Sequence, residues 1–357
     1  MNTTISLTRT DHPKPKPHDE ELEFGRVFTD HMFLMDGAPD RGWHNPRIVP
    51  YGPLTLDPSA AVFHYSQEIF EGLKAYRSPR GTILLFRPDM NAARFNRSAA
   101  RLCMQPVDEA MFLTAIKMLV AVERDWVPRA PGTSLYIRPA MIATEAFLGV
   151  RPAQTYCFFI ILSPVGAYYA EGFSPVKILV EDRYVRAVKG GMGAAKTGGN
   201  YAASLAAGEE AHRRGCAQVL WLDGVERQYV EEVGSMNIAF VLDSELVTPP
   251  LTGTILEGVT RDTVLQLAKD WGIGVAERPI AISAVLTAAR AGRLREAFGM
   301  GTAAVISPVS EFSYQGQSVT INNGQVGPLA QRLFEEISAI QRGLKPDPHG
   351  WVVEVEE

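Results

Sequence analysis

The 357-residue chain has 46% hydrophobic and 21% charged residues and a formal net charge of −5. This composition is typical of a globular protein, and the length is enough for roughly two domains. The acidic balance provides no positive field for a polyanion, which argues against a nucleic-acid partner. No run reaches the ~20 apolar residues of a membrane helix, and the N-terminus lacks a basic-then-apolar signal. We therefore expect a soluble, cytoplasmic protein without nucleic-acid or membrane partners.

The three cysteines, Cys103, Cys157 and Cys216, are odd in number, far apart and without Cys-x-x-Cys spacing. This arrangement indicates neither a disulfide framework nor a zinc site. We expect reduced thiols, as in a cytoplasmic protein, and no metal site.

The first half of the chain predicts a disordered tail followed by a small α+β domain. Residues 1–20 are polar, charged and proline-rich, so they bury too little apolar area to offset the entropy of ordering. Over residues 21–169, β-like runs (TILLF, SLYIRP, YCFFIIL) are interleaved with two helical patterns, Met90 to Met104 and Asp108 to Trp126. Glycine, proline and aromatic residues then replace this periodicity, and they predict an interdomain connection at 170–176.

The second half, residues 177–357, predicts a larger domain. A strand (VKILVE) leads through a glycine-rich loop into a helix from Tyr201 to Gly215, with Asn200 as its N-cap. Two further strand regions follow, AQVLWLDG and QYVEEVGSMNIAFVL. Another helix is expected from Val259 to Trp271, and the glycine-containing turn before it leaves backbone N–H groups free to bind a ligand.

The glycine-rich loop, KGGMGAAKTGGNY over residues 189–201, resembles two nucleotide-binding motifs and matches neither. A P-loop requires glycine where Ala195 stands, and a dinucleotide fingerprint requires its third glycine where Lys196 stands. Small residues around Lys196 let a planar ligand approach the backbone. On spacing alone, a solvated surface lysine is a better interpretation of Lys196 than a functional amine.

Other polar residues leave similar alternatives open. Glu231 and Glu232 are neighbours in a strand, so alternation points one to solvent and one inward, unless both are exposed on an edge strand. A buried carboxylate there requires a cationic partner. Arg94 lies on a helix with other arginines, where it faces either solvent or the interior. The helix start at Val259 and Thr260 and the turn GMGTAA, residues 299–304, favour a bound phosphate.

Ten segments of the sequence together resemble a known protein family. In chain order they are FTDHMF, FHYSQEIFEGLKAY, LLFRPDMNAARFNRSAARL, SLYIRP, SPVGAYY, GAAKTGGNYAASL, QVLWLDG, EEVGSMN, LVTPPLTGTILEGVTRD and FGMGTAAVISPV. The chain resembles the branched-chain amino acid aminotransferases from about Phe24 to its C-terminal helix. The resemblance implies a two-domain, α+β, fold type IV enzyme that binds pyridoxal 5′-phosphate between its domains.

The resemblance also implies roles for the cofactor-binding residues. Lys196 matches the lysine that forms a Schiff base with the cofactor and moves the substrate proton. Glu232 matches the glutamate on the pyridine nitrogen, Tyr201 the tyrosine on the ring hydroxyl, and Arg94 the arginine on the phosphate. Val259, Thr260 and Thr302 are similar to the remaining phosphate ligands.

The substrates implied are L-leucine, L-isoleucine or L-valine with 2-oxoglutarate. Residues matching the aromatic wall and its polar contacts are Phe24, Tyr65, Phe70, Tyr136, Tyr168 and Arg138. The amides of Ala303 and Ala304 match the turn that holds the α-carboxylate, and Leu148 and Val150 match a loop lent by the second subunit of a homodimer. Members from animals carry a Cys-x-x-Cys pair where this chain has Ala304 and Ser307.

Two alternatives stand beside this assignment. A D-amino acid aminotransferase or an aminodeoxychorismate lyase would share the fold, but these relatives are usually shorter and lack FTDHMF and SLYIRP. A nucleotide-binding protein would use the glycine-rich loop as a P-loop, against which Ala195 counts.

Overall fold

The computed structural model describes residues 4–166 and 173–356, and its internal contacts divide the chain into two compact units. Unit 1 contains the described residues up to 166, the short segment Ala195–Gly198, and the described residues from Ala339 onward. Unit 2 contains residues from 173 to Ala194 and from Gly199 to Ser338. Of the expected connection at 170–176, residues 170–172 lie outside the described residues, as does Tyr168.

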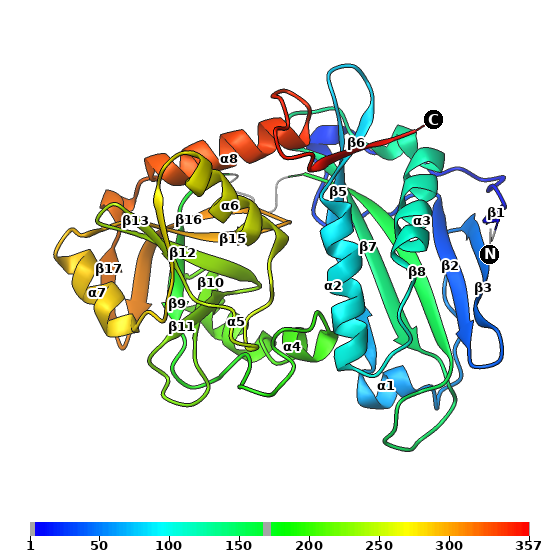
Figure 1. The fold of residues 1–357 in the computed structure, drawn as a ribbon, viewed down its shortest axis with the longest axis horizontal. Coiled ribbons are helices and arrows are strands. Elements are labelled where there is room, and N and C mark those ends of the chain that lie inside the picture. The colour runs from blue at the N-terminus through cyan, green and yellow to red at the C-terminus, as the bar shows by residue number, and fades with distance from the viewer. Residues whose placement is uncertain (1–3, 167–172, 357) are drawn as a thin grey trace. The chain divides into compact units, whose positions relative to one another are not determined.

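In the described part of unit 1, nine strands form one mixed sheet (Figure 1). Its order is β1-β3-β2-β8-β7-β5-β6-β18, with β4 paired to β7. Among the described residues of this sheet, β1 pairs in parallel with β3, and the other strand pairs are antiparallel. The strands are β1 Ser6–Leu7, β2 His31–Ala38, β3 Gly42–Pro50, β4 Glu68–Phe70, β5 Leu73–Arg77, β6 Ile83–Phe86, β7 Ser134–Ala143, β8 Tyr156–Val165 and β18 Val352–Val355.

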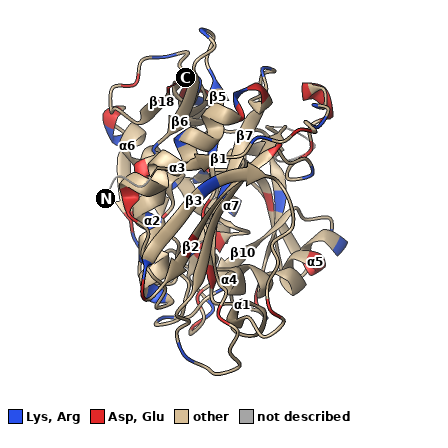
Figure 2. Cartoon of the chain, turned by 90° about the vertical axis from the view of Figure 1, so that its right-hand side faces the viewer, with Lys and Arg blue, Asp and Glu red and all other residues tan. Residues whose placement is uncertain are grey.

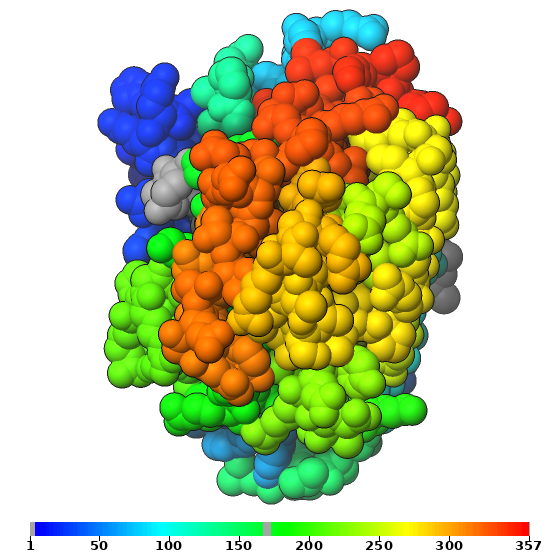
Figure 3. Space-filling model, turned by 90° about the vertical axis from the view of Figure 1, so that its left-hand side faces the viewer, coloured from blue at the N-terminus to red at the C-terminus, as the bar shows by residue number. Residues whose placement is uncertain are grey.

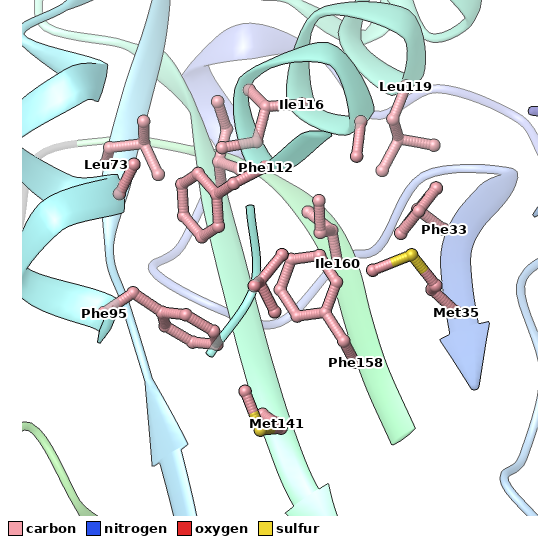
Figure 4. Packing of buried hydrophobic residues seen from close by; sticks show 14 of the residues in the cluster. Phe33, Met35, Leu73, Phe95, Phe112, Ile116, Leu119, Met141, Phe158 and Ile160 are labelled. Carbon is pink, nitrogen blue, oxygen red and sulfur yellow. The ribbon is translucent and has the colours of Figure 1, made fainter. Parts of the chain in front are cut away.

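Two helices, α2 (Pro88–Arg101) and α3 (Glu109–Val122), cover one face of this sheet. Alternate residues of β7 and β8 point toward the helices and are apolar, so the strands bury a continuous hydrophobic face. Figure 4 shows Phe95 of α2, Phe112 of α3 and Phe158 of β8 packed together, with ring centroids 5.3 to 5.8 Å apart. The opposite face of β7 carries polar residues, among them Tyr136 and Arg138.

The helices of unit 1 follow the expected pattern with small shifts at their ends. Pro88 occupies the first turn of α2, where its missing N–H is tolerated. Asp108 caps α3 by accepting a hydrogen bond from the Met111 amide at 2.9 Å. The last turn of the expected second helix is a separate 3-10 turn, η2 (Arg124–Trp126), and a short helix, α1 (Ala61–Tyr65), precedes β4.

The N-terminal segment differs from the expected disordered tail, because residues 4–20 are held along unit 1 by polar contacts. β1 pairs with β3, the Thr10 amide donates to Nε2 of His31 at 2.9 Å, and the Lys14 amide donates to Asp30 Oδ1 at 2.8 Å. The segment ends at η1 (Asp19–Glu21). The composition of the segment correctly indicates that it buries little apolar area. It does not reveal that the buried side chains of Asp30 and His31 accept hydrogen bonds from its backbone.

In the described part of unit 2, nine strands form a second sheet, in the order β11-β10-β9-β16-β15-β12-β13-β14, with β17 paired to β16. An additional β11–β12 pairing closes the strands from β11 to β12 into a ring around a hydrophobic core. The strands are β9 Val176–Val180, β10 Gln218–Leu222, β11 Val230–Val233, β12 Met236–Leu242, β13 Glu245–Thr248, β14 Gly274–Glu277, β15 Leu294–Gly301, β16 Val305–Tyr314 and β17 Gln317–Thr320.

The helices that lie wholly or mostly in unit 2 are α4 (Gly198–Ala202), α5 (Leu205–Arg213), α6 (Val259–Asp270), α7 (Ile282–Arg290) and α8 (Pro328–Gln341), and η3 (Asn322–Gly324) is a 3-10 turn. In Figure 3 the yellow-to-orange part of the chain, from α6 to α8, forms one face of this unit. The single helix expected from Tyr201 to Gly215 is divided into α4 and α5. Asn200 lies inside α4 rather than at its N-cap, and its side-chain amide donates to the Met192 carbonyl at 2.8 Å.

Two segments depart from the expected division at residue 177. The segment Ala195–Gly198, which contains Lys196, packs with unit 1, and so does the C-terminus, where β18 pairs with β6. Backbone hydrogen bonds from residues distant in sequence produce both assignments, and local periodicity carries no information about them.

Basic and acidic residues are interspersed along the chain, as the blue and red segments of Figure 2 show, in keeping with the modest net charge of −5. No helix in the described ranges combines the length and apolar character that a membrane span requires. All three cysteines are free.

Candidate active site

The segment that carries Lys196 is held against β4 and α2 of unit 1. The Lys196 amide donates to the Ser98 hydroxyl at 2.9 Å, and its carbonyl accepts from the Phe70 amide at 3.0 Å. The Lys196 ammonium lies 4.8 Å from the centroid of the Phe70 ring. The backbone on both sides of this side chain is therefore fixed, and the amine is half-buried beside an aromatic face.

One stripe of α2 supplies the groups beneath this segment. Asn91, Arg94 and Ser98 are spaced by three and four residues, so they share one face of the helix. Arg94 forms a two-pronged ion pair with Glu71, with Nε to Oε1 at 2.7 Å and Nη2 to Oε2 at 2.9 Å. Asn91 donates a further bond to Glu71 Oε2 at 2.7 Å. Arg94 is thus turned inward, the alternative that periodicity left open.

Glu71 is fully buried, and its environment decides its charge. Burial alone raises the pKa of a carboxyl group, but the charge and hydrogen bonds of Arg94, the charge of Lys196 and the Asn91 bond outweigh it, so the pKa of Glu71 is lowered. Glu71 therefore carries a negative charge at neutral pH, and it is the buried counterion of Arg94.

Four more of the expected site residues meet on the polar face of the unit 1 sheet. Arg138 donates to the Tyr136 hydroxyl at 3.0 Å, and its guanidinium lies 4.8 Å from the Phe70 ring centroid and 5.3 Å from that of Tyr136. The Phe24 ring packs edge-on against Tyr136, with centroids 5.0 Å apart. Together with Lys196 these residues form a continuous aromatic and cationic surface.

The remaining expected residues of unit 1 are on its exterior. Tyr65 ends α1 and is 39% exposed, while Leu148 and Val150 lie in the loop after β7 and are 64% and 89% exposed. This loop is tied to the start of α1, because the Ala61 amide donates to the Glu145 carbonyl and the Phe147 amide to the Ser59 carbonyl. Large apolar side chains on such an ordered loop indicate a contact surface.

In unit 2 the buried carboxylate of Glu232 has the cationic partner that its burial requires. Arg186 Nε lies 2.8 Å from Glu232 Oε2, and both side chains are buried. Glu232 Oε1 accepts from the Leu256 amide at 2.9 Å and from the Asn237 side chain at 3.3 Å. The carboxylate therefore fixes the turn that leads into α6.

That turn presents the start of α6 as an uncapped helix N-terminus. Gly258 is the N-cap, and no side chain supplies a capping hydrogen bond, so the Val259 and Thr260 amides have no acceptor within the helix. A Cβ at position 258 would overlap the Asn237 side chain, so only glycine allows this approach. Thr302, Ala303 and Ala304 form the tight turn between β15 and β16, and Tyr201 lies in α4.

Neither alternative for the adjacent glutamates, one solvated or both exposed, matches the structure. Both Glu231 and Glu232 are buried, because the segment around Thr254 and Leu256 covers β11. Burial raises the pKa of Glu231, and the Thr254 hydroxyl and the charge of Arg186 only partly oppose this effect.

Several residues that organise these groups were not found from the sequence: Glu71, Ser98, Arg186 and Asn237. For Glu71, a charged residue inside an apolar run was an available signal. A buried carboxylate requires a cationic partner, so a residue such as Arg186 was expected. The sequence does not show which of the arginines is that partner. In the described ranges, no cluster of three or more His, Cys, Asp or Glu is arranged to hold a metal.

We predict that Glu71→Gln destabilises the protein by about 3–5 kcal/mol in urea denaturation, because the buried Arg94 charge loses its counterion. The folded-state pKa of Glu71 lies below its usual value of 4.5, so this contribution is complete above that pH and is lost as the pH falls. Glu210→Gln, which removes a partly exposed partner of Arg213 and Arg214, is the control for a surface ion pair and should change little. Equal effects of the two substitutions at pH 7 would contradict the role assigned to Glu71.

Comparison with known proteins identifies the family. The family model "Amino-transferase class IV" matches residues 68–312. The chain is 57% identical to branched-chain-amino-acid aminotransferase 2 of Bacillus subtilis (strain 168), over 99% of this chain and 97% of the relative.

Two solved structures share the fold. The Escherichia coli branched-chain amino acid aminotransferase has a TM-score of 0.76 at 28% identity, covering 92% of this chain and 99% of that one. The branched-chain aminotransferase of the thermophilic archaeon Thermoproteus uzoniensis, solved with norvaline, has a TM-score of 0.76 at 27% identity, covering 91% and 100%. The chain therefore belongs to the class IV aminotransferases, the fold type IV pyridoxal phosphate enzymes, within their branched-chain amino acid aminotransferase family.

Proposed function

We propose that the protein transfers the amino group of L-leucine, L-isoleucine or L-valine to 2-oxoglutarate, reversibly, with pyridoxal 5′-phosphate attached to Lys196. One observation carries this proposal. Lys196 is held by hydrogen bonds on both sides of its backbone, and its amine lies beside the aromatic and cationic surface of Phe70, Tyr136 and Arg138.

The polar groups present are those that this cofactor requires. Unit 1 offers a primary amine at Lys196 for the aldehyde and a guanidinium at Arg94 for the phosphate. Unit 2 offers a buried carboxylate at Glu232 for the pyridine nitrogen, and the uncapped amides of Val259 and Thr260 for the phosphate. Tyr201 and Thr302 complete the proposed set, on the ring hydroxyl and the phosphate.

When bound, the cofactor provides an electron-accepting ring for the charge left at the substrate α-carbon. Lys196 acts as the base, and its neutral amine takes the proton from that carbon and returns a proton in the reverse half-reaction. Hydrogen bonds on both sides of the Lys196 backbone fix the point from which its side chain extends, and the amine lies beside the Phe70 ring. Glu232 holds the proton of the pyridine nitrogen, and Arg186 balances and orients that carboxylate.

Substrate binding requires an apolar wall and a charged contact in the same pocket. We propose that Phe24, Phe70 and Tyr136 contact the hydrocarbon side chain and that Arg138 and the Tyr65 hydroxyl bind the distal carboxylate of the acidic co-substrate. The amides of Ala303 and Ala304, in the turn after β15, are proposed to hold the α-carboxylate.

We further propose that the enzyme acts as a cytoplasmic homodimer. The exposed Leu148 and Val150, on a loop anchored by backbone hydrogen bonds, are proposed to contact the substrate pocket of the second subunit. A cytoplasmic location is supported by three unpaired cysteines.

We expect Lys196→Ala to lose the visible absorbance of bound cofactor after gel filtration and to lose about 99.9% or more of turnover, because neither covalent attachment nor proton transfer has a substitute. Lys189→Ala, an exposed lysine of the same glycine-rich loop, is the control and should retain both. A Lys196→Ala variant that keeps its colour and its turnover would refute the assignment.

For the dimer, Val150→Asp is expected to weaken self-association at least tenfold, or about 1.4 kcal/mol, in sedimentation equilibrium, because a charge is placed in an apolar contact. Val225→Asp changes another highly exposed valine, in unit 2, and should leave association unaltered. If Val150→Asp associates as tightly as the parent protein, the loop does not form the proposed contact.

A further inference from the structure

We infer that Glu68 is the counterion that allows Arg138 to serve both an apolar and an acidic substrate side chain, which makes Glu68 a specificity-determining residue. The inference rests on the proposed function, in which one pocket accepts both kinds of side chain. Neither the resemblance to the family nor the sequence pattern singled out this carboxylate.

Strand register places Glu68 on the same face as Arg138. β4 pairs with β7 so that Glu68 lies opposite Ile142 and Phe70 opposite Ala140. Because side chains alternate along each strand, Glu68, Phe70 and Arg138 all point to one face. The Arg138 guanidinium covers the Phe70 ring at 4.8 Å, so it extends from β7 toward β4 and the Glu68 carboxylate.

Glu68 is fixed by the lysine-bearing segment. Its Oε1 accepts a hydrogen bond from the amide of Gly198, two residues after Lys196. A Cβ at Gly198 would overlap this carboxylate, so the close approach depends on glycine. One oxygen of Glu68 therefore anchors the chain beside Lys196, while the charge of the carboxylate acts on the same polar face.

Arg138 lacks a direct counterion in the described part of the chain. Its Nη2 donates to the Tyr136 hydroxyl, its guanidinium lies over the rings of Phe70 and Tyr136, and its Nε makes no hydrogen bond among the described residues. The buried carboxylate beneath α2, Glu71, is already paired with Arg94. Glu68 is the carboxylate whose pKa responds to Arg138, although burial has the larger effect and leaves that pKa raised.

This arrangement has opposite consequences for the two substrates. When an isobutyl side chain displaces water from Arg138, the guanidinium still needs a negative charge nearby, and Glu68 provides it. When an acidic side chain enters, its carboxylate binds Arg138 in competition with the charge of Glu68. The carboxylate at position 68 should therefore favour the apolar ligand and moderate the affinity for the acidic one.

The test measures binding of two unreactive acids, 4-methylvalerate and glutarate, which are leucine and glutamate without their amino groups. Calorimetric titration of the cofactor-loaded protein compares the parent protein with Glu68→Gln, which keeps an acceptor for the Gly198 amide. We expect glutarate to bind roughly fivefold more tightly and 4-methylvalerate severalfold more weakly, the scale of one charge interaction of about 1 kcal/mol. Glu109→Gln, an exposed carboxylate on α3, is the control and should change neither affinity.

A double-mutant cycle separates this role from a merely structural one. In an Arg138→Gln background, Glu68→Gln should no longer change the ratio of the two affinities. Equal weakening of both acids by Glu68→Gln, or an unchanged ratio, would overturn the inference even though the parent protein transaminates L-leucine. A parent protein that fails to transaminate L-leucine would instead overturn the proposed function.

Discussion

The buried ion pair between Arg94 and Glu71 is the constraint on which the architecture of unit 1 depends. Neither charge is stable in the interior without the other, so the pair fixes α2 against the turn between β4 and β5. Ser98, one helical turn beyond Arg94, then has a defined position from which to bind the Lys196 amide. The ion pair therefore also helps to position the backbone of Lys196.

Unit 2 also contains a buried carboxylate that is paired with a buried arginine. Glu232 is buried on β11, and its two oxygens are used separately, one for Arg186 and the other for the Leu256 amide and Asn237. The turn held in this way leads directly into the uncapped N-terminus of α6. Within unit 2, Glu232 therefore provides a buried negative charge and also holds the turn before α6. The first amides of that helix have no acceptor within the helix.

Much of the fold follows from the sequence, because amphipathic periodicity survives in both units. Helix α6 begins at Val259, directly after the glycine-containing turn, as predicted. The helical pattern allowed Arg94 to face either solvent or the interior, and in the structure it faces the interior. Long-range polar contacts were not accessible in the same way. The ordered N-terminal segment depends on buried His31 and Asp30, and the membership of Lys196 in unit 1 depends on Ser98 and Phe70, partners about 100 residues away or more. Hydrophobic patterns do not encode such pairings.

We propose that the amine of Lys196 and the carboxylate of Glu232 serve the same pyridoxal phosphate. The most direct measurement is the absorbance spectrum of the purified protein before and after addition of L-leucine without an acceptor acid. We expect a coloured protein whose visible band disappears when L-leucine is added and returns when 2-oxoglutarate is added. A colourless protein, or a band that L-leucine leaves unchanged, would contradict it.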